Sequence, residues 1–169
     1  MRQSIYRVSK EGGSMTLLPK NFILRTSIGR NTHQLGAFDD ALLKAGIGNY
    51  NLIKVSSILP PKCSPKNTIT LAKGALLPSA YALIFSSDIG TTISAAVAVG
   101  IPVDTSSNGV IMEHSALGTK REAEEIVRTY VKQAMLSRNL AIKEIVSVAT
   151  EVTVISNETY CAFATVSMW

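Results

Sequence analysis

The chain has 169 residues, enough for one domain with a buried core. Charged residues make up 17 % of it, below the roughly 25 % of an average soluble domain, which indicates that part of the surface is covered in a homo-oligomer. The formal net charge of +5 comes from scattered Lys and Arg without interleaved aromatic residues, which argues against a nucleic-acid partner.

The first 16 residues are polar, and a Gly12-Gly13 pair stands near their end. We expect a flexible N-terminal tail over residues 1–16 and a single domain over residues 17–169. Whether Met1 or Met15 starts the native chain stays open. The tail contains no apolar h-region of a secretory signal, so we expect the protein in the cytoplasm.

Apolar and β-branched runs predict seven strands, over residues 22–28, 51–59, 77–86, 92–101, 109–114, 143–155 and 161–168. Pro60 and Pro61 would end the second strand, because proline cannot donate to a strand ladder. The third and fourth strands flank Asp88-Ile89-Gly90 and are typical of a hairpin. That polar break also argues against a membrane span in this apolar part of the chain.

Two helices are predicted. The first covers residues 39–46, with Asp39 and Asp40 in its first turn and Gly46 as its stop. The second follows Thr119, which forms a capping box with Glu122. Its apolar residues recur at helical spacing: Ala123, Ile126, Val127, Tyr130, Val131, Ala134 and Met135. Strands that succeed one another with few helices favour an α+β fold with mostly antiparallel sheet.

The most informative segment covers residues 46–61, Gly-Ile-Gly-Asn-Tyr-Asn-Leu-Ile-Lys-Val-Ser-Ser-Ile-Leu-Pro-Pro. Its glycines do not form a phosphate-binding loop, because neither GxxxxGK[ST] nor GxGxxG is present. From the residues alone, Ser56-Ser57 is a serine pair at a strand end, which is a common structural feature. Cys63 and Cys161 lack CxxC spacing, and the two histidines lack metal-ligand spacing, so we expect no metal site.

This segment resembles the processing site of the pyruvoyl-dependent arginine decarboxylases. The similarity continues in order along roughly residues 18–169. Its blocks are residues 38–43, 45–49, 56–61, 74–81, 92–96, 109–113, 120–124 and 161–164. The resemblance implies a sandwich of two packed, mostly antiparallel sheets flanked by helices, and a homotrimer with active sites between subunits.

The resemblance also implies self-cleavage between Ser56 and Ser57, into chains of residues 1–56 and 57–169. The Ser57 hydroxyl would attack the Ser56 carbonyl, and elimination and hydrolysis would leave a covalent pyruvoyl group at position 57. A planar peptide resists such attack, so the backbone must be held in a distorted geometry. Asn51 matches the family asparagine that donates to the oxyanion.

In turnover, the implied pyruvoyl cofactor forms a Schiff base with the amine of L-arginine and accepts the electrons released with CO2. The product would be agmatine, for polyamine biosynthesis. Glu113 matches the proton donor, and Asp39 matches the carboxylate that binds the guanidinium group. Further substrate-binding positions carried over from the family are Leu42, Gly48, Tyr50 and Ile58.

Several alternatives stay open. Without the resemblance, Asn51 is a turn residue, Glu113 an outward-facing strand residue and Asp39 a helix-capping residue. Asp40 rather than Asp39 could face the substrate. The same chemistry could act on histidine or ornithine, or the chain could be a non-cleaving, non-catalytic trimeric homologue.

Overall fold

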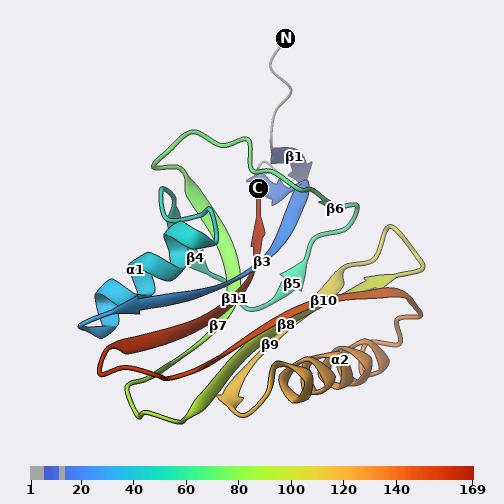
Figure 1. Ribbon diagram of the computed structural model, residues 1–169. Helices are drawn as coiled ribbons and strands as arrows, with labels where there is room; N and C mark the ends of the chain where they lie inside the picture. The colour runs from blue at the N-terminus through green and yellow to red at the C-terminus, as the bar shows by residue number, and fades with distance from the viewer. Residues whose placement is uncertain (1–5, 12–13) are drawn as a thin grey trace.

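The structure is a computed structural model that describes residues 6–11 and 14–169 (Figure 1). Its first elements are β1 (Tyr6–Glu11), β2 (Ser14–Pro19), β3 (Asn21–Asn31), α1 (Gln34–Lys44), β4 (Asn51–Lys54), β5 (Ile58–Leu59) and β6 (Ser64–Pro65). Then follow β7 (Leu76–Ser86), β8 (Thr92–Pro102), β9 (Gly109–Leu117), α2 (Lys120–Leu136), β10 (Ile142–Thr153) and β11 (Thr159–Met168).

Two sheets form the body of the molecule. One has the strand order β4-β7-β11-β3-β6 and the other the order β10-β8-β9-β5. Their long strands pair antiparallel, and only the short strands β4 and β6 pair parallel with their neighbours. The main core cluster takes residues from both sheets, so the sheets pack face to face. The predicted α+β fold with two packed sheets is confirmed.

The alternation of side chains along β11 explains how this strand serves two cores. Ala162, Ala164 and Val166 point between the sheets, where they join the main core cluster. Cys161 and Phe163 point to the other face, toward α1. Because successive side chains of a strand point to opposite faces, a strand that is apolar throughout is buried on both sides.

Helix α1 covers the outer face of the first sheet (Figure 1). Gly29 of β3 permits this close approach, because a Cβ at this position would lie 1.9 Å from the carbonyl oxygen of Ala37. The predicted stop is confirmed, since Ala45 caps the helix and Gly46 follows with φ +76°. The predicted start is wrong. The helix begins five residues earlier than Asp39, at Gln34, and His33 rather than an acidic residue caps it, by accepting a hydrogen bond from Gly36 N at 3.0 Å.

Helix α2 covers the outer face of the second sheet, and its predicted capping box is present (Figure 1). Thr119 Oγ1 accepts from Glu122 N, and the Glu122 carboxylate accepts from Thr119 N at 2.9 Å. The predicted apolar stripe packs on the sheet through Ala123, Val127 and Met135. Tyr130, which belongs to the predicted stripe, lies at its edge and is exposed.

The predicted strand over residues 51–59 is wrong in one respect that matters for the site. It is two short strands, β4 and β5, and they belong to different sheets. β4 pairs with β7, and β5 pairs with β9. The chain therefore crosses from one sheet to the other over residues 55–57.

The predicted hairpin over residues 77–86 and 92–101 is also wrong. β7 and β8 have nearly the expected bounds, but they lie in different sheets and do not pair. The turn at residues 87–91 carries the chain across the sandwich. It is fixed by Gly90 N and Val154 N, which donate to Val154 O and Thr91 O at 2.9 Å each.

The described part of the predicted N-terminal tail has regular structure. β1 and β2 pair with each other as an antiparallel hairpin, in a sheet separate from the other two. Residues 1–5 and 12–13 lie outside the described residues. The division of the chain into a tail of residues 1–16 and a single domain of residues 17–169 stays a prediction.

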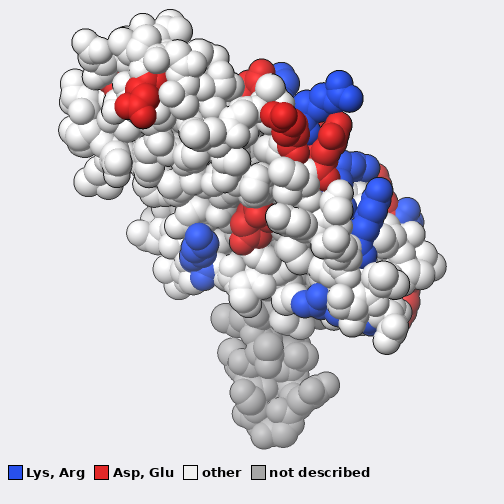
Figure 2. All heavy atoms as spheres, turned by 90° about the horizontal axis from the view of Figure 1, so that it is seen from below, with Lys and Arg blue, Asp and Glu red and all other residues white. Residues whose placement is uncertain are grey.

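Charge is unevenly distributed over the face of the molecule that is seen from below (Figure 2). Lys, Arg, Asp and Glu gather at one side of this face, and much of the remaining surface carries no charge. Among the described residues, no helix is both long enough and apolar enough to cross a membrane.

Candidate active site

The crossover between the two sheets places Ser57 in a strained position. β4 ends at Lys54, and β5 begins at Ile58 in the other sheet. Ser57 has φ +69°, in the left-handed region that a non-glycine residue seldom adopts and that costs on the order of 1–3 kcal/mol. Its carbonyl oxygen accepts a hydrogen bond of 2.8 Å from Ile111 N of β9. The peptide between Ser56 and Ser57 thus lies between the end of β4 pairing in one sheet and this hydrogen bond to the other sheet.

Glu113 binds the Ser57 hydroxyl directly. Ser57 Oγ lies 2.9 Å from both Oε1 and Oε2 of Glu113, which is half-buried on β9. Burial raises the pKa of Glu113, and the hydrogen bond from Ser57 and the charge of Lys54 offset only part of that rise. A carboxyl group with a raised pKa that contacts a hydroxyl group is suited both to accept a proton and to return it.

A cavity of about 500 Å³ opens beside this pair. Its lining residues are Lys54, Tyr81, Ala82, Leu83, Glu113, His114 and Ser115. The volume is in the range of small-ligand sites. Sequence reasoning assigned no role to Lys54, Tyr81 or Ser115. The signals for them were that Lys54 falls within the segment that resembles the processing site and that Tyr81 falls within another block shared with the family. Neither signal shows that the two side chains meet, because their proximity depends on the fold.

Lys54 and Tyr81 form a cation–π pair at this cavity. The Lys54 ammonium nitrogen lies 4.7 Å from the centroid of the Tyr81 ring. Tyr81 is held in turn by Phe38 of α1 and Phe163 of β11, with ring centroids 6.3 and 5.7 Å away. The position of the Lys54 charge is therefore set by an aromatic cluster that joins α1 to the first sheet.

Asn51 does not donate to the Ser56 carbonyl in this chain. Its Nδ2 donates to Gly74 O at 2.7 Å, and its backbone N donates to Ala75 O at 2.9 Å. It is the first residue of β4, and the four residues of that strand separate it from the crossover by roughly 10 Å or more. Within one chain, Asn51 orders the loop before β7, and its expected role at the oxyanion stays a prediction.

The two neighbouring aspartates of α1 differ in their contacts. The carboxylate of Asp40 is already paired, because its Oδ2 accepts from Lys44 Nζ at 2.7 Å and from Arg30 N at 2.8 Å. These partners lower the pKa of Asp40 against the opposing effect of burial. Asp39 is exposed, and no described residue forms a hydrogen bond or ion pair with it. Asp39 is therefore the carboxylate that stays available to a cationic ligand.

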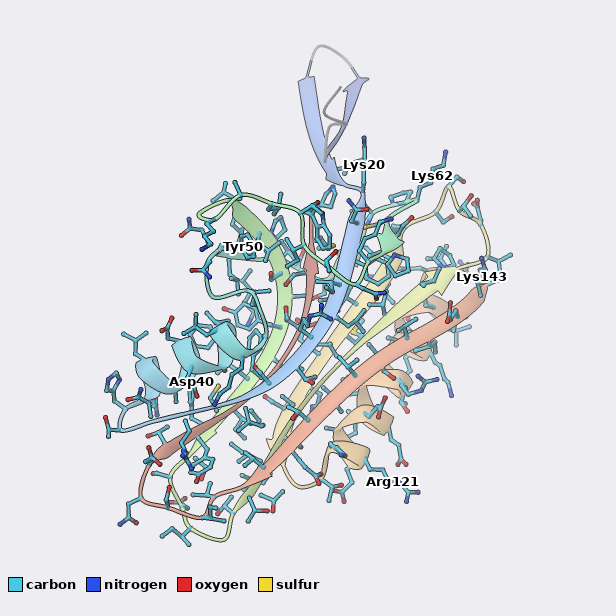
Figure 3. The ribbon with its side chains drawn as sticks, turned by 45° about the horizontal axis from the view of Figure 1, so that its top comes forward. Lys20, Asp40, Tyr50, Lys62, Arg121 and Lys143 are labelled. Carbon is cyan, nitrogen blue, oxygen red and sulfur yellow. The ribbon has the colours of Figure 1, made fainter. Side chains whose placement is uncertain are left out.

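The other family-matched positions fall into two groups. Leu42 and Tyr50 pack against the apolar cluster under α1, and Tyr50 lies in the loop that follows this helix (Figure 3). Gly48 belongs to the same loop, where a Cβ would lie 2.9 Å from Leu43. Ile58 directly follows Ser57 and is 40 % exposed. Among the described residues, no hydrogen bond or ion pair connects the α1 group with Ser57 or Glu113.

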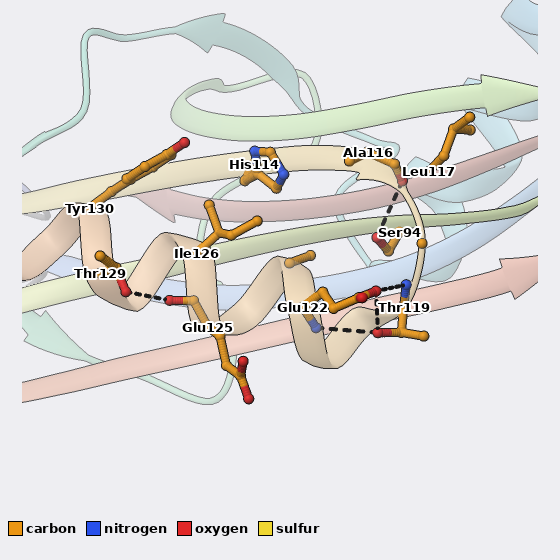
Figure 4. A pocket seen from close by; sticks show the side chains of 12 residues that line it. Ser94, His114, Ala116, Leu117, Thr119, Glu122, Glu125, Ile126, Thr129 and Tyr130 are labelled. Carbon is orange, nitrogen blue, oxygen red and sulfur yellow. Dashed lines mark hydrogen bonds between the residues drawn. The ribbon is translucent and has the colours of Figure 1, made fainter.

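A second cavity, of about 630 Å³, lies between β9 and α2 (Figure 4). His114 contributes to both cavities, but its ring packs edge-on against Tyr130 of α2, with the centroids 6.2 Å apart. The Glu122 carboxylate in the wall of this cavity is occupied by the capping box (Figure 4). In the part of the chain that the structure describes, no three His, Cys, Asp or Glu side chains gather in a way that could hold a metal ion.

Comparison with known proteins identifies close relatives. A family model described as "Pyruvoyl-dependent arginine decarboxylase (PvlArgDC)" matches residues 21–168. A pyruvoyl-dependent arginine decarboxylase of Methanococcus aeolicus is 44 % identical over 151 residues, which are 89 % of this chain and 90 % of the relative. The pyruvoyl-dependent arginine decarboxylase of Methanocaldococcus jannaschii is 43 % identical over 90 % of this chain and 91 % of the relative. The protein of the same description from Pyrococcus abyssi is 42 % identical over 80 % of this chain and 87 % of the relative.

Proposed function

The chain belongs to the pyruvoyl-dependent arginine decarboxylase family, and on this premise we propose that it cleaves itself between Ser56 and Ser57 and converts L-arginine to agmatine and CO2. The observation that carries the proposal is the contact of Ser57 Oγ with both carboxylate oxygens of Glu113, at 2.9 Å each. The left-handed backbone at Ser57 supports it as well, since a strained peptide is the starting point that self-cleavage needs.

Self-cleavage begins at the Ser57 hydroxyl. Glu113 accepts its proton as Oγ bonds to the carbonyl carbon of Ser56, and collapse of the adduct breaks the C–N bond and leaves an ester with a free amino group. Loss of the Cα proton of Ser57 then expels the Ser56 carboxylate and leaves dehydroalanine. Addition of water and loss of ammonia give the pyruvoyl group at the new end of residues 57–169.

The site fits such a group, because Ser57 contacts the carboxyl of Glu113, and Glu113 lines a cavity of about 500 Å³. A pyruvoyl group at position 57 would supply a ketone for Schiff-base chemistry with the substrate amine and would accept the electrons released with CO2. Glu113 holds the proton that the substrate Cα takes up in place of CO2. Its raised pKa suits this task, because a carboxyl that stays protonated closer to neutral pH is a more effective donor there.

Substrate binding requires a carboxylate for the guanidinium group, and Asp39 is unpaired while Asp40 is not. Asp39, Leu42, Gly48 and Tyr50 form no hydrogen bond or ion pair with the Ser57–Glu113 pair of the same described chain. We therefore assign the two groups to neighbouring subunits of a homotrimer. Exposed apolar side chains support a covered surface here: Ile53 of β4, Ile58 of β5 and Leu76 of β7.

A combined assay tests the proposal. The purified chain is analysed by denaturing electrophoresis and then incubated with L-arginine, and agmatine and CO2 are measured. A substrate panel with histidine and ornithine identifies the amino acid. Cleaved protein that releases CO2 from arginine supports the proposal, and an intact chain without activity supports the non-catalytic homologue.

A further inference from the structure

Lys54 has an ammonium group that is close enough to Glu113 to influence it, yet it does not bind Glu113. No ion pair joins the two within 4.0 Å, and Lys54 Nζ lies instead over the Tyr81 ring, 4.7 Å from its centroid. Both side chains line the same cavity. The charge of Lys54 nevertheless acts on Glu113 and lowers its pKa against the larger effect of burial.

The position of Lys54 over the Tyr81 ring leaves both oxygens of the Glu113 carboxylate in contact with Ser57 alone among these groups. Both oxygens of Glu113 are used by the Ser57 hydroxyl, at 2.9 Å each. A lysine that bound them directly would share these oxygens with Ser57 and would hold the carboxylate by a second, charged contact. A lysine anchored on an aromatic ring adds a favourable charge without occupying either oxygen.

We infer that Lys54 is a positioning residue for maturation: held over Tyr81, its charge favours the ionised form of Glu113, which accepts the Ser57 proton, and it forms no ion pair with the carboxylate that Ser57 contacts. This inference rests on the proposed self-cleavage. It assigns a further role to the aromatic cluster of Phe38, Tyr81 and Phe163, which fixes the ring on which the ammonium lies.

The other groups around Glu113 are few. Ser57 faces it from the crossover, Lys54 from β4 and Tyr81 from β7. On its own strand, the adjacent His114 also lines this cavity, and its ring packs edge-on against Tyr130 of α2. Lys54 is the one described side chain at this cavity that carries a fixed positive charge at neutral pH.

Removing the Lys54 charge should shift the pH dependence of self-cleavage to higher pH. Glu113 must be ionised to accept the Ser57 proton, so self-cleavage accelerates as pH rises through the Glu113 pKa. Lys54→Met removes the attraction between the Lys54 ammonium and the Glu113 carboxylate. The rising limb of the cleavage rate against pH should then move to higher pH, by about 0.2–0.7 units for a partly solvent-screened pair. Below the pKa, cleavage then slows about two- to fivefold. The alkaline limb of decarboxylation, which needs protonated Glu113, moves in the same direction.

The experiment measures self-cleavage rate against pH for the full-length parent, Lys54→Met and Lys54→Arg. Lys54→Arg keeps the charge and should restore the parental curve. Lys132→Met removes an equal charge from the exposed face of α2 and should leave the curve unchanged. Glu113→Gln should abolish the rise of the self-cleavage rate with pH. A limb that persists in Glu113→Gln assigns the titration to His114 or Tyr81 and overturns the inference.

A second readout does not depend on cleavage or turnover. In the Ser57→Ala chain, carbon-13 NMR follows the titration of the Glu113 carboxyl, with and without Lys54→Met. We expect a higher Glu113 pKa in the double variant. An unchanged pKa overturns the role of Lys54 even if the parent cleaves, whereas a parent that never cleaves but shows the shift refutes only the proposed function.

Discussion

Ser57 and Glu113 are 56 residues apart in the sequence, yet the Ser57 hydroxyl lies 2.9 Å from both oxygens of the Glu113 carboxylate. The contact exists because the chain leaves one sheet after β4 and joins the other at β5, which pairs with the start of β9. In the proposed mechanism the same carboxyl serves the cleavage of the chain and, afterwards, the protonation of the product.

Replacing Glu113 separates these two tasks. Glu113→Gln keeps the shape of the side chain and loses its proton chemistry. We expect maturation to become slower but still measurable, and turnover to fall by roughly the 10²–10⁴-fold typical of a lost general acid. The two rates are measured on the same preparation, by electrophoresis and by CO2 release. A variant that matures and turns over like the parent would remove Glu113 from the mechanism.

Asp39 and Asp40 provide a matched pair of substitutions on one helix. Asp39→Asn removes the free carboxylate and should cost about 1.5–3 kcal/mol of substrate binding, on the order of tenfold to a hundredfold in kcat/KM for arginine. Asp40→Asn instead breaks the contacts to Arg30 N and Lys44 and should affect stability more than kcat/KM. Steady-state kinetics and thermal melting distinguish them. The reverse pattern would mean that Asp40 faces the substrate.

Asn51 offers a test of whether active sites are shared between subunits. Because Asn51 Nδ2 donates to Gly74 O within its own chain, we expect its role in cleavage to be exerted on a neighbouring subunit. Asn51→Ala alone should stay largely uncleaved. When it is co-expressed with Ser57→Ala, mixed trimers should cleave the Asn51→Ala chain, which retains Ser57. Light scattering should give a mass near three protomers, and a complete lack of cleavage in verified mixed trimers would contradict the shared site.

The capping box of α2 predicts a stability effect without an effect on chemistry. Thr119→Ala removes the hydroxyl that accepts from Glu122 N and should destabilise the fold by about 1 kcal/mol. For a chain of this size, the melting temperature should fall by roughly 2–4 °C. Thr119→Ser keeps the cap and serves as the control. Melting curves are recorded on the Ser57→Ala background so that every chain is uncleaved, and equal melting temperatures for the three chains would refute the cap.

Local sequence signals predicted the elements but not their partners. The capping box and apolar stripe gave α2 correctly, because such signals act within a few residues. The strand break at residues 55–57 was missed, because Val55, Ser56 and Ser57 carry no proline or glycine and fit an extended run. The β7–β8 hairpin was predicted wrongly for a related reason: a turn between two strands looks the same in sequence whether the strands pair or cross to another sheet.

The candidate site was predicted only in part. The resemblance singled out Ser57 and Glu113, and the structure places them in contact. Lys54 and Tyr81 could not be predicted, since their approach depends on where β4 leaves the first sheet and on an aromatic cluster drawn from α1, β7 and β11. The capping role of His33 was missed because aspartates further along the chain offered a stronger start signal.

The most direct test of the account is an intact-mass spectrum of the purified protein under denaturing conditions. We predict two fragments, residues 1–56 with a free carboxyl group at Ser56 and residues 57–169 with a pyruvoyl group in place of Ser57. Ser57→Ala should give one uncleaved mass. An uncleaved parent chain that still decarboxylates arginine, or cleavage of Ser57→Ala at the same bond, would contradict the account.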